Sequence, residues 1–182
     1  METNYVDILR AYSGLFLLKL IMSVIVYTDG SATNNADKNK RKAGCAYLIT
    51  KNDDYIYLSG YYLNDDTNNR AELKAIYYSL CWLRHHVDNI DKSIYLISDS
   101  KYSINILTRV NKAKINTDII ENIFKLEDMF KEHGISITYK HIEAHTKRKD
   151  KHSVANDLVD KTARDCAEHE KRIKKVYKSF GE

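Results

Sequence analysis

Strand-forming runs alternate with helical stripes along this chain, and their order limits the folds that it can adopt. Runs rich in β-branched and aromatic residues occupy positions 24–28, 45–50, 55–63, 93–98 and 135–142. Helical patterns occupy positions 69–86, 101–109 and 118–131, and a last one runs from 153 to about 177. Asn52-Asp53-Asp54 between the second and third runs predicts a hairpin. This order predicts an α/β fold, in which helices flank a five-stranded mixed sheet of three antiparallel strands and then two further strands.

Turn and capping residues mark the ends of these elements. Asp29-Gly30-Ser31 is a turn signal that ends the first strand. Thr67-Asn68 supplies N-cap chemistry for the first helix. Asp118 and Glu121 stand in capping-box positions, and Ser153 can cap the last helix. The first helical pattern carries a predicted core stripe, which consists of Ile76, Leu80, Leu83 and Val87.

The composition is that of an ordinary globular domain. The chain has 182 residues, of which 43% are hydrophobic and 30% charged, and it contains no proline. A chain of this length favours one domain with its own hydrophobic core. Three cysteines without a C-x-x-C pair do not fit a disulfide framework or a zinc knot. We therefore expect an intracellular, reducing location (cytoplasm, nucleus or a viral replication site) and no secretion.

The charge is mildly basic. Lys and Arg number 29 against 25 Asp and Glu, which gives a formal net charge of +4. This charge permits a polyanionic partner without requiring one. The basic residues concentrate in three predicted loops, at 37–42, 109–114 and 147–151.

The first 22 residues differ from the rest. The apolar run at 14–22 is too short to span a bilayer, and Lys19 interrupts it. Glu2 and Asp7 precede it and no small-residue cleavage site follows, so a secretory signal fits poorly. We expect no membrane association, and favour a short added helix or a dispensable tail before a start at Met22 over a weak anchor. The predicted organisation is an N-terminal extension (1–22), a domain (23–167) and a charged helical tail (168–182).

Four acidic residues fall where the predicted fold would bring them together. Asp29 and Asp99 follow the first and fourth strands, at strand ends where open α/β sheets hold ligands. Glu72 lies in line with the buried stripe of its helix, where an acid is costly unless a cation receives it. Asp160 lies in the last helix, with Asn156 one turn earlier on the same face.

Each acid alone also fits a simpler role. Asp29 fits a turn residue and Asp99 a helix cap. Glu72 fits a first-turn acid favoured by the helix dipole, and Asp160 a solvated charged face. Convergence favours a metal site, because clustered carboxylates repel one another unless a metal neutralises them. Hard oxygen ligands select Mg²⁺ or Mn²⁺, and two such ions can activate a water and stabilise the leaving oxygen of a phosphodiester.

Four short motifs follow one another in a characteristic order. They are YTDGS at 27–31, TNNRAE at 67–72, SDSKY at 98–102 and NDLVD at 156–160. With these motifs the chain resembles ribonuclease H of type 1, including the RNase H domains of retroviral reverse transcriptases, over about residues 23–167.

The resemblance implies an RNase H-like fold and a nuclease. Such an enzyme cuts the RNA strand of an RNA–DNA hybrid with two Mg²⁺ ions, for which Mn²⁺ can substitute. It leaves 5′-phosphate and 3′-hydroxyl ends. Primer removal in DNA replication, R-loop clearance and the replication of viral or mobile genomes all need this chemistry. The expected partner is the hybrid duplex, and the expected state is a monomer.

The family's metal-binding acids carry over one by one. They match Asp29, Glu72, Asp99 and Asp160. Asp157 competes for the fourth position, because it also follows Asn156 closely. Asp160 is preferred, since Asn156 and Val159 frame it in the family's pattern, in which three residues, the last of them hydrophobic, separate an Asn from the Asp.

A histidine beside a basic loop completes the predicted catalytic set. His145 matches the family's loop histidine, which helps proton transfer or product release. His141 and His152 are nearby alternatives. The segment 109–117 is too short for the Trp-rich basic protrusion of many cellular bacterial members. The loop at 147–151 could grip the substrate in its place, or could be an ordinary solvated charge run.

Hybrid binding is expected to depend on the 2′-hydroxyl groups of the RNA strand, which lie in the minor groove. Asn68 and Asn69 match family residues that contact the substrate, although Asn68 can also act as an N-cap. The predicted substrate-binding residues are Ser31, Asn34, Asn68, Asn69, Arg70, Lys101 and Asn156.

Two other functions fit parts of this pattern. The first is a non-catalytic module that binds hybrids with the same fold, whose signature would be a lost metal-binding acid. The second is a transposase or integrase catalytic domain, which has a different acid spacing and lacks the TNNR element. Since all four acids and TNNR are present, an active nuclease is the preferred hypothesis.

Overall fold

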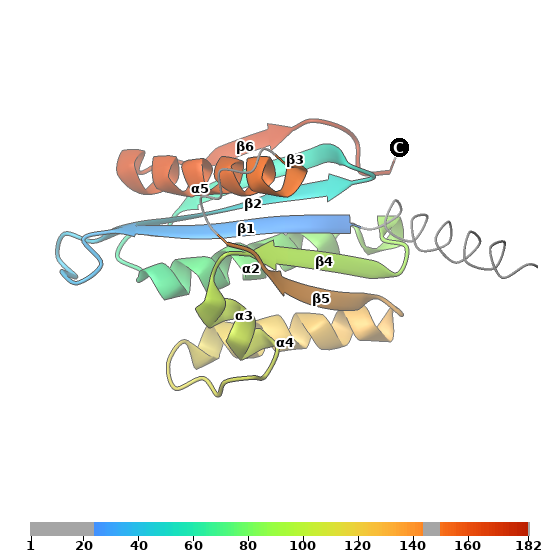
Figure 1. The fold of residues 1–182 in the computed structure, drawn as a ribbon, viewed down its shortest axis with the longest axis horizontal. Helices are drawn as coiled ribbons and strands as arrows, with labels where there is room; N and C mark the ends of the chain where they lie inside the picture. The colour runs from blue at the N-terminus through green and yellow to red at the C-terminus, as the bar shows by residue number, and fades with distance from the viewer. Residues whose placement is uncertain (1–23, 144–149, 182) are drawn as a thin grey trace, which may run out of the picture.

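A six-stranded mixed sheet in the order β5-β4-β1-β2-β3-β6 forms the centre of the protein (Figure 1). The structure is a computed structural model that describes residues 24–143 and 150–181. The elements are β1 (Val24–Thr33), β2 (Lys42–Lys51), β3 (Asp54–Tyr62), α2 (Asn68–Arg84), η1 (Val87–Asn89), β4 (Ser93–Ser98), α3 (Lys101–Leu107), α4 (Thr117–Glu132), β5 (Ser136–His141), α5 (Lys151–His169) and β6 (Ile173–Val176). The predicted α/β class and the predicted order of its first nine strands and helices are confirmed.

The strand pairing agrees with the expected topology. β1, β2 and β3 are antiparallel neighbours, whereas β4 is parallel to β1 and β5 is parallel to β4. The predicted hairpin joins β2 to β3 through Asn52 and Asp53. Both have positive φ angles, of 53° and 66°, which Asn and Asp tolerate better than most residues.

Helices cover both faces of the sheet. α5 packs on one face over Ile25, Tyr27 and Leu48, and α2 and α4 pack on the other. The predicted stripe on α2 is largely confirmed: Ile76, Leu80 and Leu83 are fully buried, and Val87, which lies beyond the helix end, is partly buried. Within the described residues, no helix is both long and apolar enough to cross a bilayer.

The predicted helical tail at 168–182 is wrong over its described part. α5 ends at His169, where Glu170 adopts a left-handed conformation that stops the helix. The chain then forms β6, which pairs antiparallel with β3 and adds a sixth strand to the expected five. The run of lysines favoured a solvated helix in the sequence, whereas pairing with the free edge of β3 decides its conformation.

Two predicted caps are also corrected. Asn116 precedes α4 in a left-handed conformation without a side-chain cap, and Asp118 instead binds Arg70. At the start of α5 the cap is Asp150, whose Oδ1 accepts a hydrogen bond from the Ser153 backbone N–H at 2.9 Å. The predicted cap on α2 is confirmed, since the Thr67 side chain accepts from a backbone N–H in the first turn.

The predicted turn at Asp29-Gly30-Ser31 is part of β1. Pairing of β1 with β4 stops at Thr28, but pairing with β2 continues to Thr33. Gly30 is needed for close packing and not for a turn. A Cβ at this position would lie 2.2 Å from the backbone nitrogen of Glu72 and 2.5 Å from the carbonyl carbon of Ala71. The first turn of α2 therefore lies directly against the backbone of β1.

Replacing Gly30 by Ala should destabilise the protein by about 1–3 kcal/mol or more, because backbone atoms cannot move aside as a flexible side chain can. The measurement is urea unfolding, with Gly181→Ala as the matched control. At Gly181 the nearest atom to an added Cβ is the Asn89 side-chain oxygen at 3.3 Å, so stability should change by less than about 0.5 kcal/mol. Equal midpoints for the two variants would contradict the close packing.

Candidate metal and catalytic site

Three carboxylates from three different elements meet at one place. Asp29 of β1, Glu72 of α2 and Asp99, which follows β4, each offer an oxygen within 4.8 Å of the others. Asp29 and Glu72 are each only 5% exposed, whereas Asp99 is partly exposed. This group has the composition and spacing of a site for a hard divalent cation.

The topology explains how distant residues reach one another. The parallel pairing of β1 with β4 ends at Thr28 and Ser98, so Asp29 and Asp99 come next on adjacent strands. Glu72 joins them because the first turn of α2 lies against Gly30. The predicted convergence of these three acids is therefore present, although Asp29 lies within β1 and not at its end.

Burial and mutual repulsion disfavour the charged forms of the two deepest acids. The pKa of Asp29 lies well above its usual range because of burial, and next because of the charges of Asp99 and Asp160. Burial raises the pKa of Glu72 in the same way, with the charges of Asp29 and Asp99 adding to it. The Glu72 Oε2 atom is buried without a hydrogen-bond partner among the described residues. A cation would satisfy this oxygen and relieve the repulsion.

Two side chains from later elements hold Asp99. Asn156 of α5 is 4% exposed and its Nδ2 donates a hydrogen bond of 3.2 Å to Asp99 Oδ2. His141 at the end of β5 places its Nε2 3.1 Å from the Asp99 backbone carbonyl oxygen, which can only accept. These contacts fix an acid that otherwise sits on a short connection between β4 and α3. His141 was predicted only as an alternative loop histidine, since its role depends on the β4–β5 register.

The two competing acids of α5 differ in their surroundings. Asp160 is partly buried, forms an ion pair with Arg164, and contributes to the raised pKa of Asp29. Asp157 is exposed and has no such effect. Asp160 does not belong to the group of three within 4.8 Å, but its carboxylate lies within electrostatic reach of that group.

Several predicted substrate residues lie near the edge that holds the acids. Ser31 follows Gly30 on β1, and Asn34 begins the next turn with a φ of 48°. The Asn68 backbone N–H donates to the Asn35 side chain at 3.1 Å, which ties the start of α2 to that turn. Asn69 and Lys101 are exposed in the first turns of α2 and α3.

Arg70 makes contacts within the protein. Its guanidinium forms a bidentate pair with Asp118, approaches the Asn116 side chain at 3.4 Å, and lies 3.4 Å from Asp66 through Nε. These contacts connect α2 to the start of α4. The predicted phosphate contact of Arg70 would require it to share or exchange these partners.

The predicted loop histidine and its basic neighbours lie outside the described residues. These are His145, Lys147, Arg148 and Lys149. The N-terminal extension through residue 23 lies outside them as well. Of the alternatives, His152 forms a 2.7 Å hydrogen bond with the Tyr27 hydroxyl, and burial lowers its pKa.

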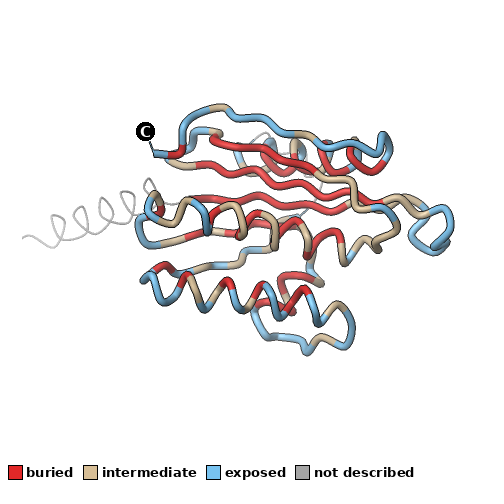
Figure 2. The backbone as a smooth tube through the Cα atoms, turned by 180° about the vertical axis from the view of Figure 1, so that it is seen from behind, coloured by how far each residue is buried: buried red, intermediate tan, exposed pale blue. Residues whose placement is uncertain are grey.

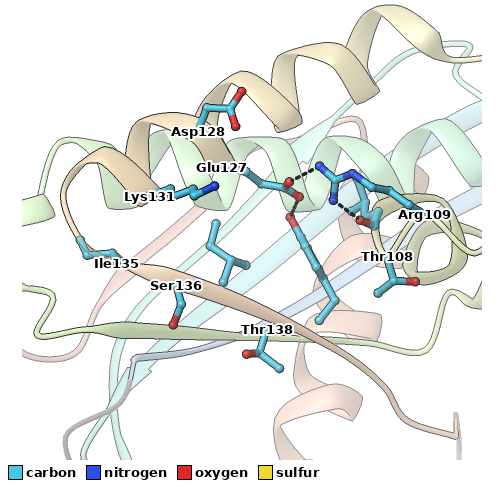
Figure 3. Close-up of a pocket in the computed structure, with 11 residues that line it drawn as sticks. Thr108, Arg109, Glu127, Asp128, Lys131, Ile135, Ser136 and Thr138 are labelled. Carbon is cyan, nitrogen blue, oxygen red and sulfur yellow. Dashed lines mark hydrogen bonds and ion pairs between the residues drawn. The ribbon is translucent and has the colours of Figure 1, made fainter.

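The carboxylates are separate from a cavity of about 710 Å³ on another part of the molecule (Figure 3). This cavity lies between α4, β5 and the end of α3, and none of the four predicted acids lines it. Inside it, Glu127 accepts hydrogen bonds from Arg109 at 3.0 Å and from the Tyr139 hydroxyl at 2.6 Å. These hydrogen bonds join α4 to β5 and to the segment after α3.

Comparison with known proteins agrees with this geometry. The sequence model of the RNase H family matches residues 22–168, most of the chain. The chain belongs to the RNase H family. It is 28% identical over 123 residues to a probable ribonuclease H of Acanthamoeba polyphaga mimivirus, covering 60% of this chain and 52% of that protein. It is 31% identical over 128 residues to ribonuclease H of Schizosaccharomyces pombe, covering 63% of this chain and 44% of that protein.

The fold also matches solved members of the family. The crystal structure of LC11-RNase H1 in complex with an RNA/DNA hybrid superimposes with a TM-score of 0.64 at 23% identity, covering 81% of this chain and 98% of that one. This likeness concerns the fold. The chain spans about half the length of the two sequence relatives.

Replacing Asp29 by Asn should stabilise the metal-free protein at neutral pH. Because Asp29 and Glu72 have raised pKa values when folded, the folded state holds protons that the unfolded chain releases. The stability of the metal-free wild type therefore falls as pH rises from about 4 through the raised values. Thermal unfolding in EDTA should show a higher Tm for Asp29→Asn at about pH 7.5, by about 2–4 °C for each kcal/mol gained, and a smaller gain near pH 4.

Asp157→Asn is the control, since its exposed side chain should leave the Tm unchanged. Added Mg²⁺ should raise the Tm of the wild type more than that of Asp29→Asn. A variant no more stable than the wild type in EDTA at about pH 7.5 would show that repulsion at this site is negligible.

Proposed function

We propose that this protein is a metal-dependent endonuclease, a ribonuclease H of type 1, that hydrolyses the RNA strand of RNA–DNA hybrids. The observation that carries the proposal is the group formed by Asp29, Glu72 and Asp99 in a chain of the RNase H family. The hybrid bound in the related crystal structure supports the same substrate class. The expected products have 5′-phosphate and 3′-hydroxyl ends.

The residues present fit Mg²⁺, and Mn²⁺ as a substitute. The unpartnered Glu72 Oε2, the burial of Asp29 and the all-oxygen donor set favour a hard divalent cation. Asp29, Glu72, Asp99 and Asp160 would hold two ions. When bound, such a pair supplies an activated water and stabilises the leaving oxygen of the cleaved phosphodiester.

The chain's own side chains then have distinct tasks. Asn156 and His141 hold Asp99 in place through its carboxylate and its carbonyl. The backbone N–H of Gly30 donates to Asp29 Oδ1 at 2.8 Å and orients that carboxylate. We propose that His145 transfers a proton at the departing product, as its type and position in the sequence suggest.

Recognition of the hybrid is assigned to the same edge. Asn69 lies in the first turn of α2, and Ser31 follows the glycine of β1 that packs against α2. Asn34 precedes Asn35, which accepts a hydrogen bond from the backbone at the start of α2. Such amides and hydroxyls can bind ribose 2′-hydroxyls and backbone oxygens. Lys101 is exposed two residues after Asp99, where it can approach a phosphate of the strand held by the acids. Asn156 is only 4% exposed, so its hydrogen bond to Asp99 explains its position better than a contact with the substrate does.

Cleavage of a labelled RNA–DNA duplex with Mg²⁺ tests this proposal directly. The wild type should cut the RNA strand, and Asp99→Asn should lower the rate by at least about 100-fold, more than loss of an outer partner of a metal ligand costs. An all-DNA duplex of the same sequence is the substrate control. Cleavage of that duplex, or equal rates for the two proteins, would refute the proposal. Hybrid binding without cleavage by the wild type would instead indicate a non-catalytic module.

The fourth acid is tested by a matched pair of variants on one helix. Asp160→Asn should lower the cleavage rate by about 10–100-fold and raise the Mg²⁺ concentration needed for half-maximal activity. The reason is that the variant loses a proposed metal-binding carboxylate that lies outside the group of three acids. Asp157→Asn should cut at the wild-type rate, since that side chain is exposed. The opposite pattern would assign the role to Asp157.

A further inference from the structure

The C-terminal strand carries a concentrated positive charge that the sequence analysis did not assign to the substrate. Residues 171–178 contain Lys171, Arg172, Lys174, Lys175 and Lys178, and no acid. Lys174 and Lys175 lie on β6, at the outer edge of the sheet, and Lys171 and Arg172 precede it. Figure 2 shows this stretch as a largely exposed run along one side of the molecule.

Aromatic rings support three of these cations. Arg172 lies over the ring of Tyr61 at 4.8 Å and donates to its hydroxyl at 3.3 Å. Lys174 lies 5.9 Å from the ring centre of Tyr57, and Lys175 lies 4.4 Å from that of Tyr177. Such contacts leave the positive charge intact while limiting the freedom of the side chain.

Among the described residues, most of this charge has no acidic partner. Lys178 pairs with Asp54. In residues 24–143 and 150–181, by contrast, no carboxylate forms an ion pair with the other four cations, Lys171, Arg172, Lys174 and Lys175. We call these four residues the basic edge.

The strand register places the basic edge level with the carboxylates. Asp29 pairs with Ala46, Ala46 with Gly60, and Gly60 with Ile173, so one row crosses four strands. Three strand spacings of about 4.8 Å put the start of β6 about 14 Å from Asp29 along the sheet. α5 covers this row at Gly60, where an added Cβ would lie 2.7 Å from Cys166 and 2.8 Å from Thr162, so α5 separates the acids from the basic edge on that face. The phosphates of one strand follow one another about every 3.4 Å along a duplex axis. A backbone engaged at the acids therefore brings phosphates near the basic edge about four or more steps further along.

We infer that the basic edge is a second contact surface for the phosphodiester backbone of the nucleic acid that carries the hybrid. The inference rests on the proposed function, which supplies a nucleic-acid substrate. Lysine and arginine charges on an exposed strand would bind phosphates without regard to sequence and release counterions on binding. This contact would raise affinity at a distance from the carboxylates, and so would lower KM without changing the chemical step.

A different role for charged edge strands is protection against strand-to-strand association. The two roles make different predictions when the charges are removed. Loss of a phosphate contact weakens hybrid binding by the monomer and makes that binding less dependent on salt. Loss of edge protection produces larger assemblies and leaves binding by the monomer unchanged.

The test compares two variants with equal loss of charge. The first replaces Lys171, Arg172, Lys174 and Lys175 by Gln. The control replaces Arg84, Lys92, Lys125 and Lys131 by Gln, which are also exposed and also three lysines and one arginine. Binding of a fluorescent hybrid is measured by anisotropy without divalent cations, over about 50–200 mM salt. Size-exclusion chromatography reports the assembly state, and circular dichroism reports folding.

The basic-edge variant should bind at least about tenfold more weakly at about 100 mM salt, and the slope of log affinity against log salt should fall by about 2–4. In Mg²⁺ its KM should rise while kcat stays within about twofold. The triple variant Lys171→Arg, Lys174→Arg and Lys175→Arg keeps the charge and should retain wild-type binding. Loss of binding in that variant would trace the effect to packing and overturn the inference.

The inference would also be overturned if the basic-edge variant had the same hybrid affinity and salt slope as the control. It would equally be overturned if the variant formed larger assemblies while its monomer bound the hybrid as the wild type does. Failure of the proposed function has a separate signature, namely no cleavage of the hybrid by the wild type. In that case, a lower salt slope for the basic-edge variant than for the control would still show that the basic edge binds polyanions.

Discussion

The contact between the first turn of α2 and the backbone of β1 at Gly30 determines the geometry of the site. No side chain separates the two elements there, and an added Cβ would lie 2.2 Å from the backbone nitrogen of Glu72. This approach brings a helical acid against a strand acid. The parallel pairing of β1 with β4 adds Asp99 from the other side. A small displacement of α2 would separate Glu72 from Asp29, so the site depends on one backbone contact.

The same packing stores an electrostatic conflict inside a folded domain. Asp29 and Glu72 are buried side by side, and burial and repulsion raise the pKa of both. A chain selected for stability alone would place apolar residues here. The surrounding core offsets this cost: Leu73, Ala75 and Ile76 of α2 and Val24 and Val26 of β1 are fully buried. A divalent cation bound between these carboxylates would reverse the sign of the interaction.

Support for the site extends beyond the acids. Asn156 on α5 and His141 on β5 reach Asp99 from two later elements of the chain. Arg70 ties α2 to α4 through Asp118. Both faces of the sheet therefore contribute to holding the carboxylates. If the basic edge binds nucleic acid, this mildly basic chain carries its acids on β1, α2 and the end of β4 and the contacting bases at the outer edge of the same sheet.

The sequence by itself determined the α/β class, the order of the first nine elements, the β2–β3 hairpin and the family, because these depend on local periodicity, turn chemistry and short motifs. It also pointed to Asp29, Glu72 and Asp99, since strand ends and a buried helical stripe are readable along the chain. Only the tertiary structure decided the sixth strand, the extension of β1 through Gly30, the pairing of Arg70 with Asp118 and the contacts of Asn156 and His141 with Asp99. The reason is that each of these depends on a partner distant in sequence: a lysine-rich segment becomes a strand when β3 presents a free edge, and a polar side chain acquires its role from the register that sets its neighbour.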